Sequence, residues 1–192
     1  MNVRKLVNVG LVLLVLVAIV GLYRLTPTQK DIQQPVAVKG ITGKAVQAPR
    51  FELTVESIRV SKKLKVPRTT PDRDTLTDFV VVDAVVKATR EPLHLRKVEI
   101  RTAAGVTYLG SNRSGLDRVL LTGFQFAPDI PARGSFVVEM PATELPGATL
   151  LVTEKAIFTD LEPQATIPLG VTESTVDGLR TELATLKSVS DL

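Results

Sequence analysis

Hydrophobic and polar positions divide the chain near residue 25. Residues 6–25 are almost wholly apolar, with Asn8 as the strongly polar exception and Tyr23 and Arg24 at the far end. Twenty helical residues span about 30 Å, the thickness of the hydrocarbon core of a bilayer. This stretch is longer than the core of a signal peptide, and no small-x-small cleavage site follows it. Residues 1–25 therefore predict an uncleaved signal-anchor, a transmembrane helix that contacts the lipid bilayer through residues 6–25.

The charges that flank this stretch favour a cytoplasmic amino terminus. Arg4 and Lys5 precede it, whereas Arg24 lies at its far end and Lys30 follows it, so the positive-inside bias is slight. We expect a single-pass protein of the cell membrane whose C-terminal domain lies outside the cytoplasm. Residues 26–44 combine prolines and glycines with polar residues, which predicts a linker.

Residues 45–171 have the periodicity of β-strands. Residues 51–55 alternate between apolar and polar, and the alternation slips by one at Glu56 and Ser57. Such a slip predicts a β-bulge. Residues 79–86 are apolar except for Asp83, which predicts a central strand whose even-numbered side chains face the core.

Turn residues separate further short strands in this region. Residues 98–101 and 106–109 flank a loop that ends in Gly105, which predicts a hairpin with a positive φ at the glycine. Further strands are predicted at residues 120–126, 135–140, 149–153 and 165–169. About seven or eight short strands with frequent turns predict a mainly β fold, an antiparallel sandwich or barrel.

The period changes again in residues 172–192. Val176, Leu179, Leu183 and Leu186 are three or four positions apart. This spacing predicts a short amphipathic C-terminal helix from about residue 175 to residue 189. Its apolar stripe either packs on its own domain or contacts a partner helix.

Composition narrows the chemistry that the chain can perform. It has no cysteine, which excludes disulfides, thiol catalysis and thiolate metal sites. The net charge of +4 is a mild excess spread among many acidic residues, unlike the concentrated basic surface of a nucleic-acid binder. We therefore expect no nucleic-acid partner.

The strongest charge asymmetry lies in one strand and the loop after it. Arg59, Lys62, Lys63, Lys65 and Arg68 place five cations within ten residues, without a carboxylate among them. One interpretation is a solvated, mobile loop. The other is a binding site for an anionic partner, either an envelope polymer or lipid headgroups.

No catalytic or metal site is expected. His94 is the only histidine and lies near no serine or cysteine motif, so it is interpreted as structural. Asp72, Asp74 and Asp78 form an acidic trio, but Arg73 interrupts it and neither the glycine nor the closing glutamate of a calcium loop follows. Because no phosphate loop, dinucleotide fingerprint or hydrolase elbow occurs, we expect neither an enzyme nor a cofactor.

Several segments together carry a family resemblance: residues 51–55, 79–87, 91–93, 105–108 and 130–141. In this order they resemble a group of exported immunoglobulin-like domains of Gram-positive bacteria, the immunoprotective extracellular protein-like superfamily. The resemblance covers roughly residues 43–170, although Ala88, Thr89 and Arg90 stand where the group often has Asn-Thr or Asn-x-Gly. It implies an immunoglobulin-like antiparallel β-sandwich and an exported location, and it implies no activity.

These expectations describe a membrane-anchored, extracytoplasmic binding or scaffolding module of the cell envelope, without catalytic activity. One alternative is an accessory subunit of a membrane protein complex, docked through the anchor helix and the tail. Another is a ligand-binding or enzymatic domain whose site lies in residues 62–78 or 110–118. The sequence specifies neither the partner nor the oligomeric state.

Overall fold

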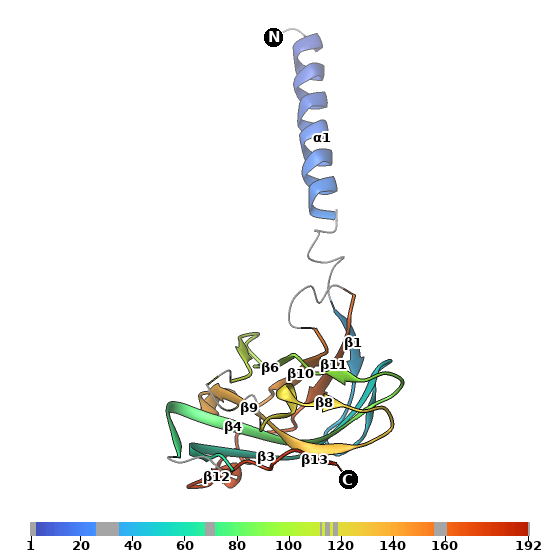
Figure 1. Ribbon diagram of the computed structural model, residues 1–192. Helices are drawn as coiled ribbons and strands as arrows, with labels where there is room; N and C mark the ends of the chain where they lie inside the picture. Colours follow the sequence, from blue (N-terminus) through green and yellow to red (C-terminus); the bar gives the residue numbers. More distant parts are fainter. Residues whose placement is uncertain are drawn as a thin grey trace. The chain divides into compact units, whose positions relative to one another are not determined.

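The chain forms two compact units, Met1–Gln34 and Pro35–Leu192. The computed structural model describes residues 3–25, 35–67, 72–111, 113, 116, 119–155 and 161–191. The first unit holds helix α1 (Val3–Leu25), whose side chains are described from Gly10 to Arg24 (Figure 1). Over the described residues, no helix reaches the length and apolarity that a membrane crossing requires.

The second unit is a β-sandwich with two main sheets (Figure 1). We call the first of them sheet A. In order across it lie β1 (Val36–Lys39), β11 (Pro163–Pro168), β10 (Thr149–Thr153), β6 (Lys97–Arg101) and β7 (Thr107–Leu109). The strand β1 pairs in parallel with β11, and the other neighbours are antiparallel. The predicted hairpin is confirmed as β6 and β7, with a φ of 85° at Gly105.

Sheet B contains the two longest strands. In order across it lie β12 (Ala184–Thr185), β3 (Phe51–Lys65), β4 (Arg73–Ala88), β9 (Ala132–Met140) and β13 (Ser190–Asp191), with β2 (Val46–Gln47) also paired to β3. The register of β3 on β4 shifts between Val55 and Ser57, which confirms the predicted bulge. The strand β4 lies between β3 and β9, so its predicted central position is confirmed as well.

Short elements complete the sandwich. Strands β5 (Leu93–His94) and β8 (Gln125–Phe126) pair as a small ribbon, and the 3-10 turns are η1 (Leu121–Gly123), η2 (Ala142–Glu144) and η3 (Asp177–Leu179). The predicted strand at residues 120–126 is therefore wrong over most of its length. The N–H of Gly123 donates to the Leu120 carbonyl at 3.0 Å, a local bond that replaces a ladder bond with a neighbouring strand.

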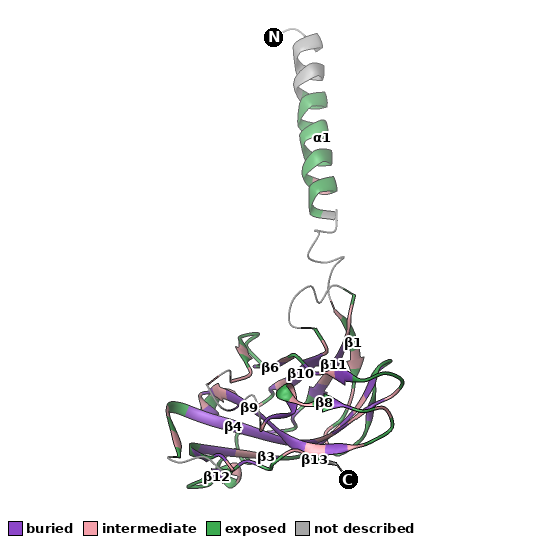
Figure 2. Cartoon of the chain, viewed as in Figure 1, coloured by how far each residue is buried: buried purple, intermediate pink, exposed green. Residues whose placement is uncertain are grey.

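Residues 78–84 of strand β4 are buried without a break, so this part of the strand is buried on both faces (purple in Figure 2). Val80 and Val82 belong to the main core between the sheets. Phe79 and Val81 point the other way, into a second apolar cluster on the opposite side of sheet B. The apolar run in the sequence thus reflects a strand that has an apolar cluster on each of its two faces.

The second cluster is covered by two segments distant in sequence. Leu116 and Leu120 come from the connection after β7, and Ala184 and Leu186 come from the C-terminal segment. All members of the two clusters, with the side chains packed against them, lie between Val38 and Val189. The second unit therefore has a hydrophobic core of its own.

The predicted linker of residues 26–44 is wrong at its C-terminal end. Residues 36–39 form β1, and the Gly40 N–H donates to the Thr166 carbonyl at 2.9 Å. Residues 36–39 are too few to show the alternation of a strand in the sequence, and they become a strand because they pair with the edge of β11. Residues 26–34 lie outside the described part of the chain.

The predicted C-terminal helix is also wrong. Strand β12 pairs in parallel with β3, β13 pairs antiparallel with β9, and the helical content is one 3-10 turn at Asp177–Leu179. Ala184 and Leu186 are buried, whereas Thr185 between them is exposed, which is the alternation of an extended chain. Pairing with the two edges of sheet B outweighs the weak helix preference of a segment rich in threonine and serine.

The four residues proposed as a partner-helix contact do not share a face. Val176 and Leu179 pack against the main core, and Leu186 is buried in the second cluster. Leu183 is 38% exposed. The hypothesis of a partner helix on this stripe is therefore excluded, and the tail belongs to the sandwich.

Two leucines three positions apart test this extended tail. We expect Leu186→Ala to lower the free energy of unfolding by about 2–5 kcal/mol, because it empties a buried site. Leu183→Ala should change it by less than about 1 kcal/mol. Urea unfolding of residues 35–192 measures both values, and equal losses would instead favour the helical stripe.

Candidate functional site

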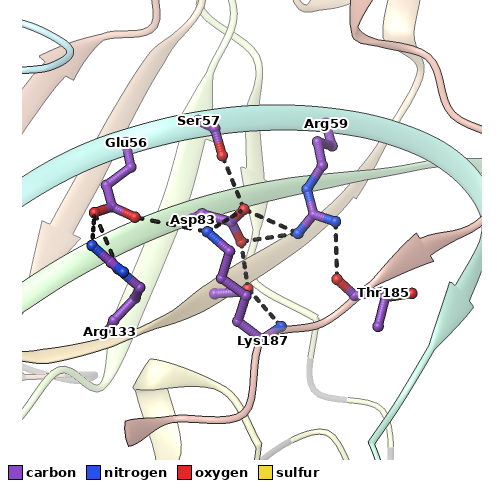
Figure 3. A network of polar contacts seen from close by, with 8 residues as sticks. Glu56, Ser57, Arg59, Asp83, Arg133, Thr185 and Lys187 are labelled. Atoms are coloured by element: carbon purple, nitrogen blue, oxygen red, sulfur yellow. Dashed lines mark hydrogen bonds and ion pairs between the residues drawn. The ribbon is translucent and has the colours of Figure 1, made fainter. Parts of the chain in front are cut away.

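A buried carboxylate lies on the outer face of sheet B, the face that carries the second apolar cluster. We call this the covered face. The side chain of Asp83, on β4, is 1% exposed. It accepts a hydrogen bond from Ser57 Oγ at 2.9 Å, and Arg59 Nη2 lies 3.0 Å from both carboxylate oxygens (Figure 3). Ser135 Oγ donates a further hydrogen bond at 2.6 Å. Lys187 Nζ adds a second cation at 3.2 Å. The carboxylate is thus surrounded by donors.

These donors decide the protonation of Asp83. Burial by itself raises the pKa of the Asp83 carboxyl, but the hydrogen bonds from Ser135 and Ser57 and the charge of Arg59 outweigh it. The pKa is therefore held below its ordinary value of 3.8. A carboxylate that stays ionised and fully bonded is suited to holding structure together and is poorly suited to proton transfer.

The Asp83 network fastens the C-terminal strap, which we define as residues 180–191. Arg59 Nη1 donates to the Thr185 carbonyl at 2.9 Å (Figure 3). The Lys187 N–H donates to Ser135 Oγ at 3.4 Å. Lys187 also lies 3.7 Å from Glu56, which pairs with Arg133 at 2.7 Å. The network therefore ties the strap to β3, β4 and β9 together.

A second acidic residue of β4 holds the start of the strap. Asp78 is 8% exposed and accepts a hydrogen bond from the Ala142 N–H at 3.0 Å. Its other oxygen pairs with Arg180 Nη1 at 3.3 Å. Beside it, the Thr181 N–H donates to the Val60 carbonyl at 2.8 Å. Of the predicted acidic trio, Asp78 is thus a structural anchor, whereas Asp72 and Asp74 are exposed.

Arg113 is a further anchor, which the sequence did not indicate. Its guanidinium bonds Glu139 Oε1 at 2.8 Å, donates to the Asp74 carbonyl at 2.8 Å and lies 5.2 Å from the ring centroid of Phe79. Ser111 Oγ also donates to Glu139 at 2.9 Å. The connection after β7 is therefore fixed to sheet B, as the strap is.

The predicted basic cluster divides into two parts. Arg59 is part of the Asp83 network. Lys62, Lys63 and Lys65 are exposed, and within the described residues they form no ion pair. Arg68 lies outside the described part of the chain.

The three free lysines lie on one end of the β3–β4 hairpin, which we call the basic arm (residues 62–67 and 72–77). Its described residues also include Arg73 and the acidic Asp72 and Asp74, which leaves an excess of two positive charges. Ser61 pairs with Phe79 and Lys63 pairs with Asp74, so four residues of β4 oppose Lys62 alone. This large bulge displaces Leu76, whose side chain is fully exposed.

The remaining predicted residue, His94, is in the small ribbon. Its side chain is half-buried in β5, and among the described residues its buried Nδ1 has no hydrogen-bond partner. Among the residues that the structure describes, no group of His, Asp and Glu gathers as metal ligands would. Of the predicted site residues that the structure describes, Lys62, Lys63 and Lys65 are thus the ones that stay exposed as cations without an ion pair.

Comparisons with known proteins give distant likenesses of structure alone. No family model matches the chain, and no curated protein does. An uncharacterized beta-sandwich protein from Clostridium difficile 630 is 12% identical, with a TM-score of 0.47, over 75% of this chain and 99% of that one. The secreted protein MPT63 from Mycobacterium tuberculosis is 17% identical, with a TM-score of 0.46, over 69% and 97%. The yjhA protein from Bacillus subtilis is 11% identical, with a TM-score of 0.43, over 66% and 97%.

Replacement of Asp83 by asparagine tests the buried network. We expect Asp83→Asn to lower the free energy of unfolding by about 2 kcal/mol at pH 7, since it weakens several hydrogen bonds to a charged group. The pKa of Asp83 is lower in the folded state than in the unfolded state. The stability from its charge is therefore complete above about pH 4 and is lost as the pH falls through the folded pKa.

Urea unfolding from pH 7 to pH 2 should show the wild-type and Asp83→Asn curves converging at the acid end. The matched control is Asp177→Asn, which removes an exposed partner of Arg180. The control should follow the wild-type curve throughout. A constant gap between wild type and Asp83→Asn at every pH would contradict the assigned shift.

Proposed function

We propose that this chain is a non-catalytic binding module of the cell envelope, anchored to the membrane, which binds an anionic polymer through the basic arm. The observation that carries the proposal is the group formed by Lys62, Lys63 and Lys65. These side chains are exposed on one hairpin, and within the described part of the chain none of them is in an ion pair.

The distribution of the other cations supports this assignment. Arg59, Arg113, Arg133, Arg180 and Lys187 all pair with carboxylates on the covered face of sheet B. A ligand that competed for those cations would disturb the fold. The lysines of the arm can bind a partner without breaking an internal bond, and each contributes about 1 kcal/mol near a charged surface.

The chemistry of lysine favours a polymer over a small ligand. An ammonium group is a hydrated point charge on a flexible stem, and it does not impose the bidentate geometry of arginine. Lysines on a hairpin therefore suit a repeating anion whose charges are spread along a chain. The exposed side chain of Leu76 adds an apolar contact beside them.

Two observations support the anchor: the apolar sequence of residues 6–25 and the exposure of the apolar side chains of α1. The described apolar side chains from Leu11 to Val20 are exposed, among them Leu14 at 70% and Val17 at 71%. Exposed apolar surface of this extent favours transfer into an apolar environment. We propose that residues 6–25 lie in the membrane, with the amino terminus cytoplasmic and the sandwich extracytoplasmic.

We further propose that the sandwich is a variant of the immunoglobulin fold. The order β11–β10–β6–β7 of sheet A follows the G-F-C-C′ order of a variable-type domain, with hairpins at both ends. In sheet B, β3, β4 and β9 would correspond to A, B and E, and the departure from that fold lies in the C-terminal strands β12 and β13, which flank them. We also propose that the chain belongs to the exported group that its sequence resembles.

Charge reversal on the arm tests polymer binding. We expect residues 35–192 to bind poly(glycerol phosphate), with an affinity that falls as salt is raised to 0.5 M, and not to bind neutral dextran. The variant Lys62→Glu/Lys63→Glu/Lys65→Glu should bind at least tenfold more weakly. Isothermal titration measures both affinities.

The control variant makes the same change in net charge elsewhere. Lys39, Lys44 and Arg101 are also exposed, and Lys39→Glu/Lys44→Glu/Arg101→Glu should retain affinity within about threefold. Equal losses in the two variants would assign the effect to net charge and contradict a site on the arm. Binding to phosphatidylglycerol vesicles without binding to the polymer would replace the polymer by lipid headgroups.

Deletion of residues 1–25 tests the anchor. We expect the full chain to sediment with membranes and to resist extraction at high salt and at alkaline pH, because apolar contacts are not screened. The truncated chain should be released. Protease added outside intact cells should digest the sandwich, and release of the full chain by salt alone would overturn the proposed anchor.

A further inference from the structure

Two residues after β7 connect the two sheets on one side of the sandwich. The Gly110 N–H donates to the Val98 carbonyl in sheet A at 2.7 Å, and the Ser111 N–H donates to the Val137 carbonyl in sheet B at 2.7 Å. A Cβ at residue 110 would lie 3.2 Å from the Val98 carbonyl oxygen, so this close crossing favours glycine. A cavity of about 400 Å³ lies beside the crossing.

The walls of this cavity are mainly apolar and come from both sheets. Val98 and Leu109 line it from sheet A, Phe136 and Val137 line it from sheet B, and Leu120 lines it from the connection between them. Leu109 is 63% exposed, whereas the other four are buried. The volume lies in the range of about 300–1,000 Å³ that is usual for small-molecule sites, and such walls favour a hydrocarbon.

The charged residues at the cavity are cations. Arg96 and Lys97 line it, and no acidic side chain does so within the described part of the chain. Lys97 pairs with Glu99 at 3.1 Å. Arg96 is exposed, and the described residues offer it no ion pair. One positive charge is therefore uncompensated beside an apolar wall.

We propose that this cavity binds the alkyl chain of an amphipathic anion, with its carboxylate or other anionic head group at Arg96. The chain covers the exposed face of Leu109 and occupies the cavity beside it. A neutral hydrocarbon would leave Arg96 without a counter-charge, and a cationic amphiphile would be repelled. The cavity contains no residue of the basic arm, so this site is separate from the one proposed for the polymer.

A series of single-chain amphiphiles tests the class of ligand. Residues 35–192, which contain the whole core, are titrated calorimetrically with octanoate, nonanoate and decanoate. We expect saturable binding of one molecule, with the Kd falling about fourfold per added methylene, as about 0.8 kcal/mol per buried CH₂ implies. Decyltrimethylammonium should bind at least tenfold more weakly than decanoate, with decanol between them.

Two variants with matched controls locate the site. Arg96→Glu should weaken decanoate at least tenfold and strengthen decyltrimethylammonium, whereas Arg101→Glu, at the other end of β6, should change neither. Leu109→Ser should weaken all three decyl compounds, whereas Val106→Ser, an exposed apolar residue of the same hairpin that does not line the cavity, should not. Both sites are exposed, so the variants should fold, which urea unfolding verifies.

Two results would overturn the proposal: no saturable binding of decanoate below its micelle concentration, or equal effects of the variants and their controls. The variant Lys62→Glu/Lys63→Glu/Lys65→Glu separates this site from the arm. It should lose the polymer and keep decanoate. Loss of decanoate in that variant would contradict two independent sites.

Discussion

Strand β4 carries Val80 and Val82 into the core between the sheets, and it carries Phe79 and Val81 into a second cluster on the opposite side. A sheet with apolar groups on both faces is stable only if something covers the second face. In this protein the cover is built from the C-terminal strap and from the connection after β7. The positions of the arm, the strap and the cavity all follow from this requirement.

The cover also brings charge into the interior. Asp83 lies in the same outward row as Val81, and burying an unpaired carboxylate there would cost several kcal/mol. Ser57, Ser135, Arg59 and Lys187 supply the donors that prevent this cost. The same residues that satisfy Asp83 hold the strap in place, so the apolar cover and the polar network stabilise each other.

This arrangement limits where a partner can bind. One face of an open sandwich is often free for recognition, but here the strap occupies the outer face of sheet B. The two proposed sites therefore use other surfaces: the exposed lysine side chains of the basic arm, whose Leu64 and Val66 are buried in the second cluster, and the cavity beside β7. A charged hairpin and an apolar cavity favour ligands of different chemistry, so the two proposed sites can be tested independently.

The sequence by itself determined the features that depend on neighbours along the chain. The alternation of residues 51–55, the slip at Glu56, the hairpin at Gly105 and the apolar run of β4 are each visible within a few positions, because side chains in a strand alternate with a period of two.

The tertiary structure decided the rest. Residues 36–39 and the strap become strands only because sheet edges are available to pair with them. The Asp83 network joins residues from Ser57 to Lys187, and the cavity joins β6 to β9. Contacts over such separations leave no local period in a sequence, so only the folded chain could place them.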